Sequence, residues 1–295
     1  MTAMIISVIA GKGSPGASAS ALSLTLTWPR PVLLIEADPA GGSLVLGYAA
    51  GADVGGRGLT GVRVAARRSG MVEAIWANVV TLDENRWLLP GAGTTRQTEA
   101  IDYPAIAVAL ADLGVDVIVD AGRIPAPVRH DALSVAADLV LVAMRSTLPA
   151  VHAAQTVAAV AGEILGTSTQ RASSAEDWVL RSVIVGAGRP YSERDIRAAM
   201  ADIAPVAGML AWDAASAGAL VDALPAPRQI ASTPLMRSAA KLATSLARQG
   251  EPDTIATGPA TAQAVHRAGR TSEASAARHP SRTPEPAAVR VGGAS

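Results

Sequence analysis

Short runs of β-branched and other apolar residues alternate with Ala- and Leu-rich stretches of helical period along the first 249 residues. Strands that are apolar on both faces and alternate with helices are typical of a mostly parallel sheet with helices on both faces. The sequence therefore predicts one α/β domain over residues 1–249. The expected strands are Ile5–Ala10, Val32–Glu36, Trp87–Leu89, Val115–Asp120, Leu139–Met144, Val179–Val185 and Val206–Leu210. The expected helices are Ser18–Thr27, Thr98–Leu113, Pro149–Leu165, Ser192–Asp202, Ala214–Leu224 and Pro234–Gln249, with a shorter one near Val62–Arg68.

The composition changes after Gln249. Residues 250–295 are rich in Ala, Pro, Thr, Ser and Arg and contain almost no large apolar side chains. Such a segment cannot bury enough apolar surface to offset the conformational entropy lost on folding. We therefore expect a disordered tail over 250–295, and a segment that docks on a partner protein is the alternative.

Composition and charge exclude several classes of protein. The chain is 49% apolar and 17% charged, which is typical of a folded protein, and its formal net charge is zero. Specific nucleic-acid binding is therefore not indicated. The absence of cysteine excludes disulfides, thiolate metal sites and cysteine nucleophiles.

The apolar start of the chain is expected to be a buried strand rather than a signal peptide. No positive charge precedes it, and Lys12 interrupts it. No uncharged apolar run approaches the length of a membrane span. The sequence thus predicts a cytoplasmic protein with no membrane segment.

A glycine-rich loop between the first expected strand and the first expected helix is the strongest local signal. It reads Gly11-Lys12-Gly13-Ser14-Pro15-Gly16-Ala17-Ser18. Glycines let backbone N–H groups turn toward one point, and the following helix adds its positive dipole end, as a phosphate-binding loop requires. Of the Walker pattern G-x-x-x-x-G-K-[ST], the two glycines and the final serine are present, whereas Ala17 stands where the lysine belongs. By pattern alone, an ordinary strand–turn–helix connection explains the loop about as well.

Lys12 is unusual within this chain. The 25 basic residues include only two lysines, Lys12 and Lys241, and all the others are arginines. The compact ammonium group of a lysine suits a phosphate loop better than a planar guanidinium does. With two lysines, chance placement remains the alternative.

Acidic residues follow two of the expected strands. The strand Val32–Glu36 runs into Ala37-Asp38-Pro39-Ala40-Gly41-Gly42, and the strand from Val115 ends in Asp120-Ala121-Gly122. In open α/β sheets, ligands bind at the carboxyl ends of the strands, so these acids are expected to meet the glycine-rich loop. A carboxylate there can hold the Mg²⁺ shell or orient a water molecule for attack on a terminal phosphate. Each acid taken alone is more often a helix cap or a turn former.

The order of these three segments resembles the MinD/ParA family of P-loop ATPases over about 240 residues. The deviant Walker loop of that family reads roughly K-G-G-x-G-K-[ST]-[ST]. The segment Glu36-Ala37-Asp38-Pro39 is similar to the D-x-D-P motif of the first switch, and the segment from Asp116 to Gly122 is similar to the Walker B strand and second switch. The resemblance implies ATP and Mg²⁺ as cofactors, a homodimer, and an unknown protein partner in partition, envelope or secretion machinery.

The resemblance also implies roles for individual residues. Lys12 matches the signature lysine that in the family crosses the dimer interface to the partner's nucleotide, and Asp38 matches the aspartate implicated in hydrolysis, so these two are the expected catalytic residues. Ser18, Asp38 and Asp120 are the expected Mg²⁺ site. Asp213 lies in a segment that resembles the family's P-x-D motif and is an expected nucleotide contact. The expected contacts of the loop with the nucleotide are Gly11, Lys12, Gly13, Ser14, Gly16, Ala17, Ser18 and Ala19.

The sequence also departs from the family pattern. Ala17 removes the lysine that touches the β- and γ-phosphates, and Pro15 lacks an N–H that could bind phosphate. Gly186 and Ala187 provide no amide side chain where the family often has an adenine-side Asn. The departures favour a pseudo-ATPase or weak ATPase acting as a dimeric regulatory or positioning subunit. The intact acids favour an active ATP-hydrolysing switch, and a phosphate-handling metabolic enzyme of the same fold is the third hypothesis.

Overall fold

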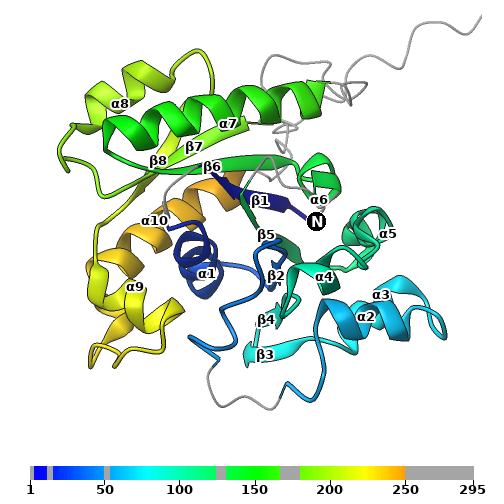
Figure 1. Ribbon diagram of the computed structural model, residues 1–295. Coiled ribbons are helices and arrows are strands. Elements are labelled where there is room, and N and C mark those ends of the chain that lie inside the picture. Colours follow the sequence, from blue (N-terminus) through cyan, green and yellow to red (C-terminus); the bar gives the residue numbers. More distant parts are fainter. Residues whose placement is uncertain (1–2, 12–15, 50–53, 124–130, 167–179, 250–295) are drawn as a thin grey trace, which may run out of the picture. The chain divides into compact units, whose positions relative to one another are not determined.

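The computed structural model describes residues 3–11, 16–49, 54–123, 131–166 and 180–249 of the 295-residue chain. Within these ranges the strands form one eight-stranded sheet in the order β3-β4-β2-β5-β1-β6-β7-β8 (Figure 1). Only the pair β3 and β4 is antiparallel, and the other described neighbours are parallel. The strands are β1 (Ile5–Ala10), β2 (Val32–Glu36), β3 (Val80–Asp83), β4 (Arg86–Leu89), β5 (Asp116–Arg123), β6 (Leu139–Arg145), β7 (Leu180–Val185) and β8 (Val206–Leu210). The predicted mostly parallel sheet is confirmed.

Helices cover both faces of the sheet, as the sequence predicted (Figure 1). One face carries α1 (Ala17–Thr27), α9 (Ala214–Val221) and α10 (Pro234–Gln249). The other face carries α2 (Leu59–Ala65), α3 (Met71–Trp76), α5 (Tyr103–Ala109), α6 (Asp131–Val135), α7 (Leu148–Gly166) and α8 (Glu193–Met200). A short helix, α4 (Thr95–Thr98), follows β4.

The central strands are buried on both sides because successive side chains point to opposite faces of the sheet. On β1, Ile5 and Ile9 belong to the core beneath α5, α6 and α7, whereas Ile6 and Val8 belong to the core beneath α1 and α10. All four side chains are at most 6% exposed. This double burial explains why the strands read as continuous apolar runs.

A buried carboxylate fixes the amino-terminal edge of the sheet. Asp116, at the start of β5, accepts hydrogen bonds from the Met4 backbone N–H (2.8 Å), the Trp28 indole N–H (2.7 Å) and the Arg30 guanidinium (2.6 Å). It is only 5% exposed, so these donors replace the water that its charge loses on burial. Asp116 is thus a structural residue, at the end of β5 opposite Asp120.

The predicted helix Thr98–Leu113 is wrong. The chain leaves the helical path after α4, and α5 begins at Tyr103, followed by a single 3₁₀ turn over Leu110–Asp112. Asp102 caps the new helix, because its carboxylate accepts the N–H of Ala105 at 3.1 Å. Pro104, in the first turn, has no N–H to continue a preceding helix.

Other boundaries also differ from the prediction. The short helix expected near Val62–Arg68 begins three residues earlier, at Leu59, and β5 continues to Arg123. The sequence did not predict β3, α3 or α6. Val179 and the predicted tail over 250–295 lie outside the described residues, so the tail stays a prediction.

Among the described helices, α7 has the length and apolar composition of a membrane span. The sequence analysis did not anticipate this. The helix nevertheless contacts β6 and β7, and it buries Val151, Ala154, Val157, Ala158, Ala161 and Leu165 in the core. This is the packing of a core helix.

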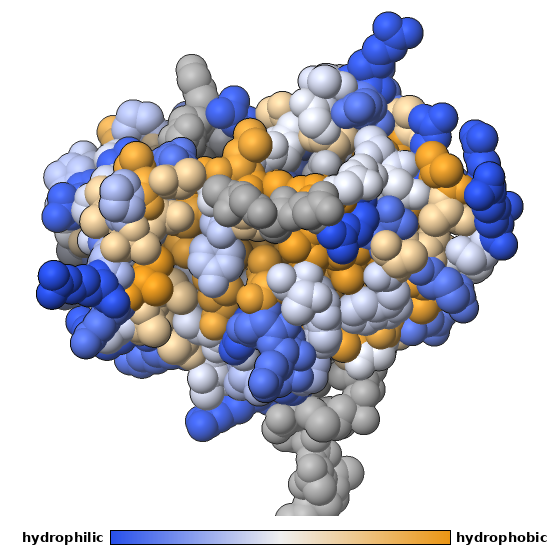
Figure 2. All heavy atoms as spheres, turned by 90° about the horizontal axis from the view of Figure 1, so that it is seen from below, coloured by the Kyte–Doolittle hydropathy of each residue, from blue (hydrophilic) through white to orange (hydrophobic). Residues whose placement is uncertain are grey.

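Apolar side chains also reach the surface on the face that Figure 2 shows, where they are interspersed with polar ones. Large exposed apolar residues occur in the loop after β2, where Leu46 is 74% exposed, and after α9, where Leu224 is 55% exposed. Gly47 holds the loop against α9, because a Cβ at this glycine would lie 2.6 Å from the carbonyl oxygen of Val221. The loop that follows Asp38 is therefore fixed on α9 while some of its apolar side chains remain in solvent.

Candidate functional site

The glycine-rich loop leads into α1 through a left-handed turn. Gly16, at the N-cap of α1, has φ 84° and ψ 31°, a conformation that glycine adopts without steric cost. Its carbonyl oxygen accepts the N–H of Ser20 at 2.8 Å, which starts the helix. Lys12, Gly13, Ser14 and Pro15 lie outside the described residues, so the roles predicted for them stay predictions.

Gly11, at the other end of the loop, lies against the backbone of α7. A Cβ placed on it would be 2.9 Å from the carbonyl oxygen of Ala153. Any side chain would therefore force the loop and α7 apart. The glycine is required by this close approach as well as by any phosphate that the loop holds.

The first turn of α1 carries no positive charge among its described side chains. Ala17 is 8% exposed, and its methyl group belongs to the core beneath α1 and α10. Ser18 and Ala19 follow it and are partly exposed. The position where the MinD/ParA pattern has a lysine is thus occupied by a buried methyl group.

Asp120, on β5, is the most unusual acid of the site. Its side chain is completely buried. Oδ1 accepts the N–H of Gly122 at 3.3 Å, while Oδ2 has no hydrogen-bond partner among the described residues. Burial raises the pKa of Asp120 to about 7, the charges of Glu36 and Asp38 raise it further, and the Ser18 hydroxyl and the Gly122 N–H oppose the shift. A buried acid with an unpaired oxygen is a candidate cation ligand.

Asp38 meets Asp120 at the carboxyl ends of β2 and β5. The two strands are tied there by a hydrogen bond from the Ala37 N–H to the Asp120 carbonyl oxygen, at 2.8 Å. The Asp38 carboxylate lies directly against Gly122, because a Cβ on that glycine would be 2.3 Å from the Asp38 Cγ. One Asp38 oxygen accepts the N–H of Ala40 at 2.8 Å. The structure thus brings Asp38, Asp120 and Ser18 together, as the sequence predicted for the expected Mg²⁺ site.

Glu36 has a structural function that sequence reasoning did not identify. Its side chain is 2% exposed. One oxygen accepts the backbone N–H groups of Ser43 at 2.5 Å and Leu44 at 2.8 Å, and the other accepts the N–H of Gly91 at 3.0 Å. The carboxylate therefore joins the loop after Asp38 to the end of β4. Gly42 leaves room for it, since a Cβ there would lie 2.4 Å from a Glu36 oxygen.

A second group of residues gathers at the carboxyl ends of β6, β7 and β8. The guanidinium carbon of Arg145 lies 4.3 Å from the ring centroid of Trp212, and that of Arg189 lies 5.8 Å from it. The Trp212 side chain lies against Gly186, where an added Cβ would be 3.0 Å from the Trp212 Cβ. We call Arg145, Gly186, Arg189 and Trp212 the base-side corner, because Gly186 is where the family pattern places its adenine-side Asn. The sequence analysis noted Gly186 but did not foresee the arginines.

Asp213, an expected nucleotide contact, is used as a helix cap in this structure. Its two oxygens accept the backbone N–H of Ser216 at 3.1 Å and the Ser216 hydroxyl at 2.6 Å. Partial burial would raise the pKa of Asp213, but these bonds, together with the Leu235 N–H and the Thr233 hydroxyl, hold it below its usual value. The carboxylate therefore stabilises the start of α9.

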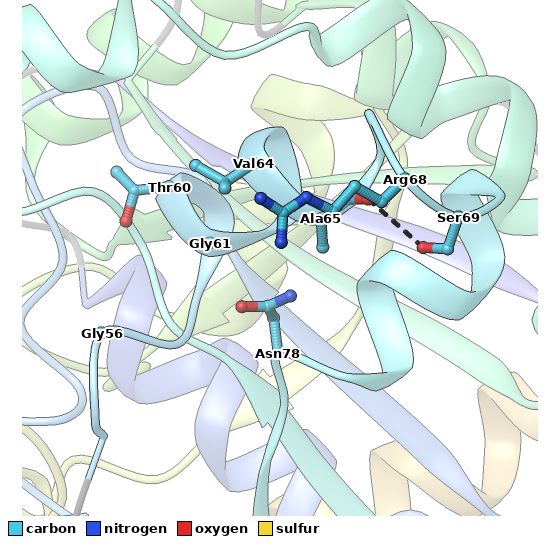
Figure 3. A pocket seen from close by; sticks show the side chains of 8 residues that line it. All are labelled: Gly56, Thr60, Gly61, Val64, Ala65, Arg68, Ser69 and Asn78. Carbon is cyan, nitrogen blue, oxygen red and sulfur yellow. Dashed lines mark hydrogen bonds between the residues drawn. The ribbon is translucent and has the colours of Figure 1, made fainter.

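The largest cavity characterised among the described residues lies elsewhere (Figure 3). It measures about 620 Å³ and is bounded by α2 and the residue that follows α3, Asn78. Its lining residues are Gly56, Thr60, Gly61, Val64, Ala65, Arg68, Ser69 and Asn78. None of them belongs to the site that the sequence predicted.

Solved structures with the same fold support the assignment of these strand ends to a nucleotide-binding architecture. MinD of Pyrococcus furiosus, a cell division ATPase, is 21% identical, with a TM-score of 0.62 over 83% of this chain and 98% of that chain. The chain has the MinD/ParA fold. MinD of Pyrococcus horikoshii OT3, complexed with Mg-ADP, is 19% identical, with a TM-score of 0.63 over 83% of this chain and 96% of that chain. A ParA family ATPase of Chlorobium tepidum is 13% identical, with a TM-score of 0.62 over 83% of this chain and 99% of that chain.

No protein-family model matches the sequence, and no curated protein matches it either. The similarity to MinD and ParA is thus one of fold, and the predicted MinD/ParA-like fold is confirmed. Sequence identities of 13–21% carry no residue roles across.

Proposed function

We propose that this chain binds a nucleotide with Mg²⁺ at the loop before α1 and acts as a dimeric regulatory or positioning subunit. ATP is the nucleotide that the resemblance implies, and turnover is weak or absent. The proposed partners are components of partition, envelope or secretion machinery. The observation that carries the proposal is the buried Asp120 carboxylate, which has an unpaired oxygen beside Ser18 and Asp38.

The three side chains suit Mg²⁺ because it prefers oxygen ligands and keeps much of its water, so one or two carboxylates and a hydroxyl suffice when a phosphate completes the shell. The Ser18 hydroxyl, Asp38 and Asp120 supply such oxygens. A cation would also compensate the charge that burial makes costly at Asp120. The N-terminus of α1, which follows the left-handed turn at Gly16, favours an anionic phosphate at the same place.

Weak turnover follows from Ala17. Phosphoryl transfer is accelerated mainly by positive groups that stabilise charge in the transition state. The Ala17 methyl group is buried and supplies no such charge. Losing one partner of a buried charge pair typically costs about 2–5 kcal/mol, which converts a dissociation constant near 1 μM to roughly 0.03–5 mM. Binding persists at the lower end of this range, whereas hydrolysis loses whatever the lysine contributes to the transition state alone.

An active ATP-hydrolysing switch is the second candidate. The position of Asp38 favours it, since this carboxylate lies against Gly122 next to the end of β5, where it can orient a water molecule. The two candidates differ in turnover and agree on binding. A turnover assay on the Mg²⁺-saturated protein therefore separates them.

Binding is tested by calorimetry with nucleotide in the presence and absence of Mg²⁺. We expect binding that Mg²⁺ strengthens in the parent protein, and loss of this Mg²⁺ effect in Asp120→Asn, which keeps the shape of the side chain and removes its charge. Asp112→Asn is the matched control, because Asp112 is exposed on the 3₁₀ turn after α5. Absence of nucleotide binding in the parent, or an unchanged Mg²⁺ effect in Asp120→Asn, would refute the proposed site.

The dimer is tested at Lys12. If this residue reaches the nucleotide of a second subunit, Lys12→Ala leaves the folding of the monomer unchanged and abolishes nucleotide-dependent dimerisation. Lys12→Arg restores it incompletely, because a planar guanidinium is larger than an ammonium group. Sedimentation with and without nucleotide and Mg²⁺ measures this. A parent that stays monomeric at saturating nucleotide, or a variant that dimerises equally well, contradicts the role of Lys12 in the dimer.

A further inference from the structure

The base-side corner lies next to the loop that is proposed to hold the phosphates. A Cβ on Gly16 would lie 3.9 Å from Cγ1 of Val185, and Val185 directly precedes Gly186. The corner and the start of α1 thus form one continuous surface at the carboxyl ends of the strands. A nucleotide with its phosphates at Gly16 can place its base at this corner.

An exposed aromatic ring provides a stacking surface there. Trp212 is 38% exposed, although tryptophan is a large apolar residue that is usually well buried. Stacking of a base on an aromatic ring or on a guanidinium is favourable for every base, because every base has a π-face. Stacking on Trp212 and Arg145 therefore provides affinity and does not choose between purines.

Selection between purines depends on hydrogen-bonding groups. The acceptors nearest the corner are already occupied: the Ser146 hydroxyl donates to the Gly186 carbonyl oxygen at 2.6 Å and accepts the Arg189 N–H at 3.0 Å. The Asp213 carboxylate is occupied by Ser216.

The remaining polar side-chain groups at the corner are the guanidinium groups of Arg145 and Arg189 and the indole N–H of Trp212. All of them are hydrogen-bond donors and none is an acceptor. Neither guanidinium forms an ion pair with any described residue. The side chains of the corner therefore present donors only.

We infer that this corner selects guanine over adenine. Guanine presents two neighbouring acceptors, O6 and N7, which an arginine can bind together, whereas adenine presents the N6 amino group, a donor, in place of O6. A corner without an acceptor side chain leaves this amino group unpaired. The inference rests on the proposed nucleotide site and narrows its ligand to guanine nucleotides.

The test compares GDP, ADP and IDP binding to the full chain by calorimetry in the presence of Mg²⁺. We expect GDP to bind about 5- to 100-fold more tightly than ADP, which is the range of one bidentate arginine–guanine pair. IDP keeps O6 and N7 but lacks the 2-amino group, so it should bind like GDP. 7-Deaza-GDP lacks N7 and should bind more weakly than GDP.

Arg145→Gln and Arg189→Gln identify the arginine responsible. A glutamine can both accept from N6 and donate to N7 of adenine, so the responsible variant shifts the preference toward ADP. Arg194→Gln is the matched control, because Arg194 is an exposed residue of α8. Circular dichroism and melting temperature verify that each variant is folded.

The possible outcomes separate this inference from the proposed function. ADP binding as tight as GDP binding, or a GDP/ADP ratio that neither glutamine variant changes, would overturn the guanine preference and leave the nucleotide site intact. Failure of every nucleotide to bind the parent would overturn both. A GDP preference that one variant reduces, together with an unchanged ratio in Arg194→Gln, would support the inference.

Discussion

Replacement of Glu36 by Gln tests how the site is held together. In the folded protein the Glu36 carboxylate accepts three backbone N–H groups, those of Ser43, Leu44 and Gly91, and it is 2% exposed. A glutamine oxygen can still accept the first two. Its NH₂ group then faces the N–H of Gly91, so two donors meet and neither is satisfied.

The cost of this replacement can be worked from these contacts. A buried donor left without a partner costs about 1–3 kcal/mol, and two bonds that lose a charged acceptor weaken by about 0.5–1 kcal/mol each. The free energy of unfolding should fall by about 2–5 kcal/mol. For a domain of this size that lowers the melting temperature by about 4–20 °C. Differential scanning calorimetry and urea unfolding measure the two quantities.

Two further variants separate charge from reach. Glu36→Asp keeps the charge but withdraws the carboxylate by one methylene, so it should lose at least the bond to Gly91 and also destabilise the fold. Glu163→Gln, at an exposed position of α7, should melt with the parent. If Glu36→Gln also melts within about a degree of the parent, the three bonds contribute no net stability and the reasoning fails.

Three other predictions concern the candidate site and the tail. Because the pKa of Asp120 is raised to about 7 in the folded state and is near 4 in the unfolded chain, its protonation contributes stability that is complete below about pH 4 and is lost as the pH rises through about 7. Asp120→Asn should therefore unfold at a free energy about 2–4 kcal/mol above that of the parent at pH 8 without Mg²⁺; urea titrations that give no such gain would refute the burial argument. Ala17→Lys should strengthen binding of Mg-ATP at least several-fold, because it restores a charge at the start of α1, and calorimetry that shows equal affinities would contradict this. A chain that ends at Gly250 should melt within roughly a degree or two of the parent, since residues 251–295 contain almost no large apolar side chains, and a drop of many degrees would place the domain boundary later in the chain.

Much of the fold could be predicted from the sequence because its central strands are buried on both faces. β1, β2 and β8 have the predicted bounds, since each is a continuous apolar run ending in a polar or glycine-containing segment. β3 and α3 were missed because they are short and partly exposed, so neither shows a clear period. The break before α5 depended on one capping bond of Asp102, which an Ala-rich window does not reveal.

The site was predictable only where its residues are close in sequence to a strand end. Asp38 and Asp120 met this condition. Glu36 was placed in the right segment, but its function was not foreseen because its partners are backbone N–H groups, which no side-chain pattern marks. The nearby Gly42 and Gly91 were the available signal, since a buried carboxylate needs small neighbours to approach backbone.

The base-side corner could not have been predicted at all. Arg145, Arg189 and Trp212 lie far apart along the chain and come together only because β6, β7 and β8 are adjacent and parallel. An arginine or a tryptophan alone at a strand end gives no sign of the contact between them.

The unpaired oxygen of Asp120 has a consequence for the amount of protein that a cell maintains. A fold that buries an uncompensated acid populates its unfolded state more than its packing alone would dictate, and proteases degrade that state. A cation and nucleotide that bind only the folded state reduce this population, by a factor of about 100 when the ligand is present at 100 times its dissociation constant. The lifetime of the protein would then follow the supply of its ligand, so that abundance in the cell reports occupancy of the site even if no phosphate is ever cleaved there.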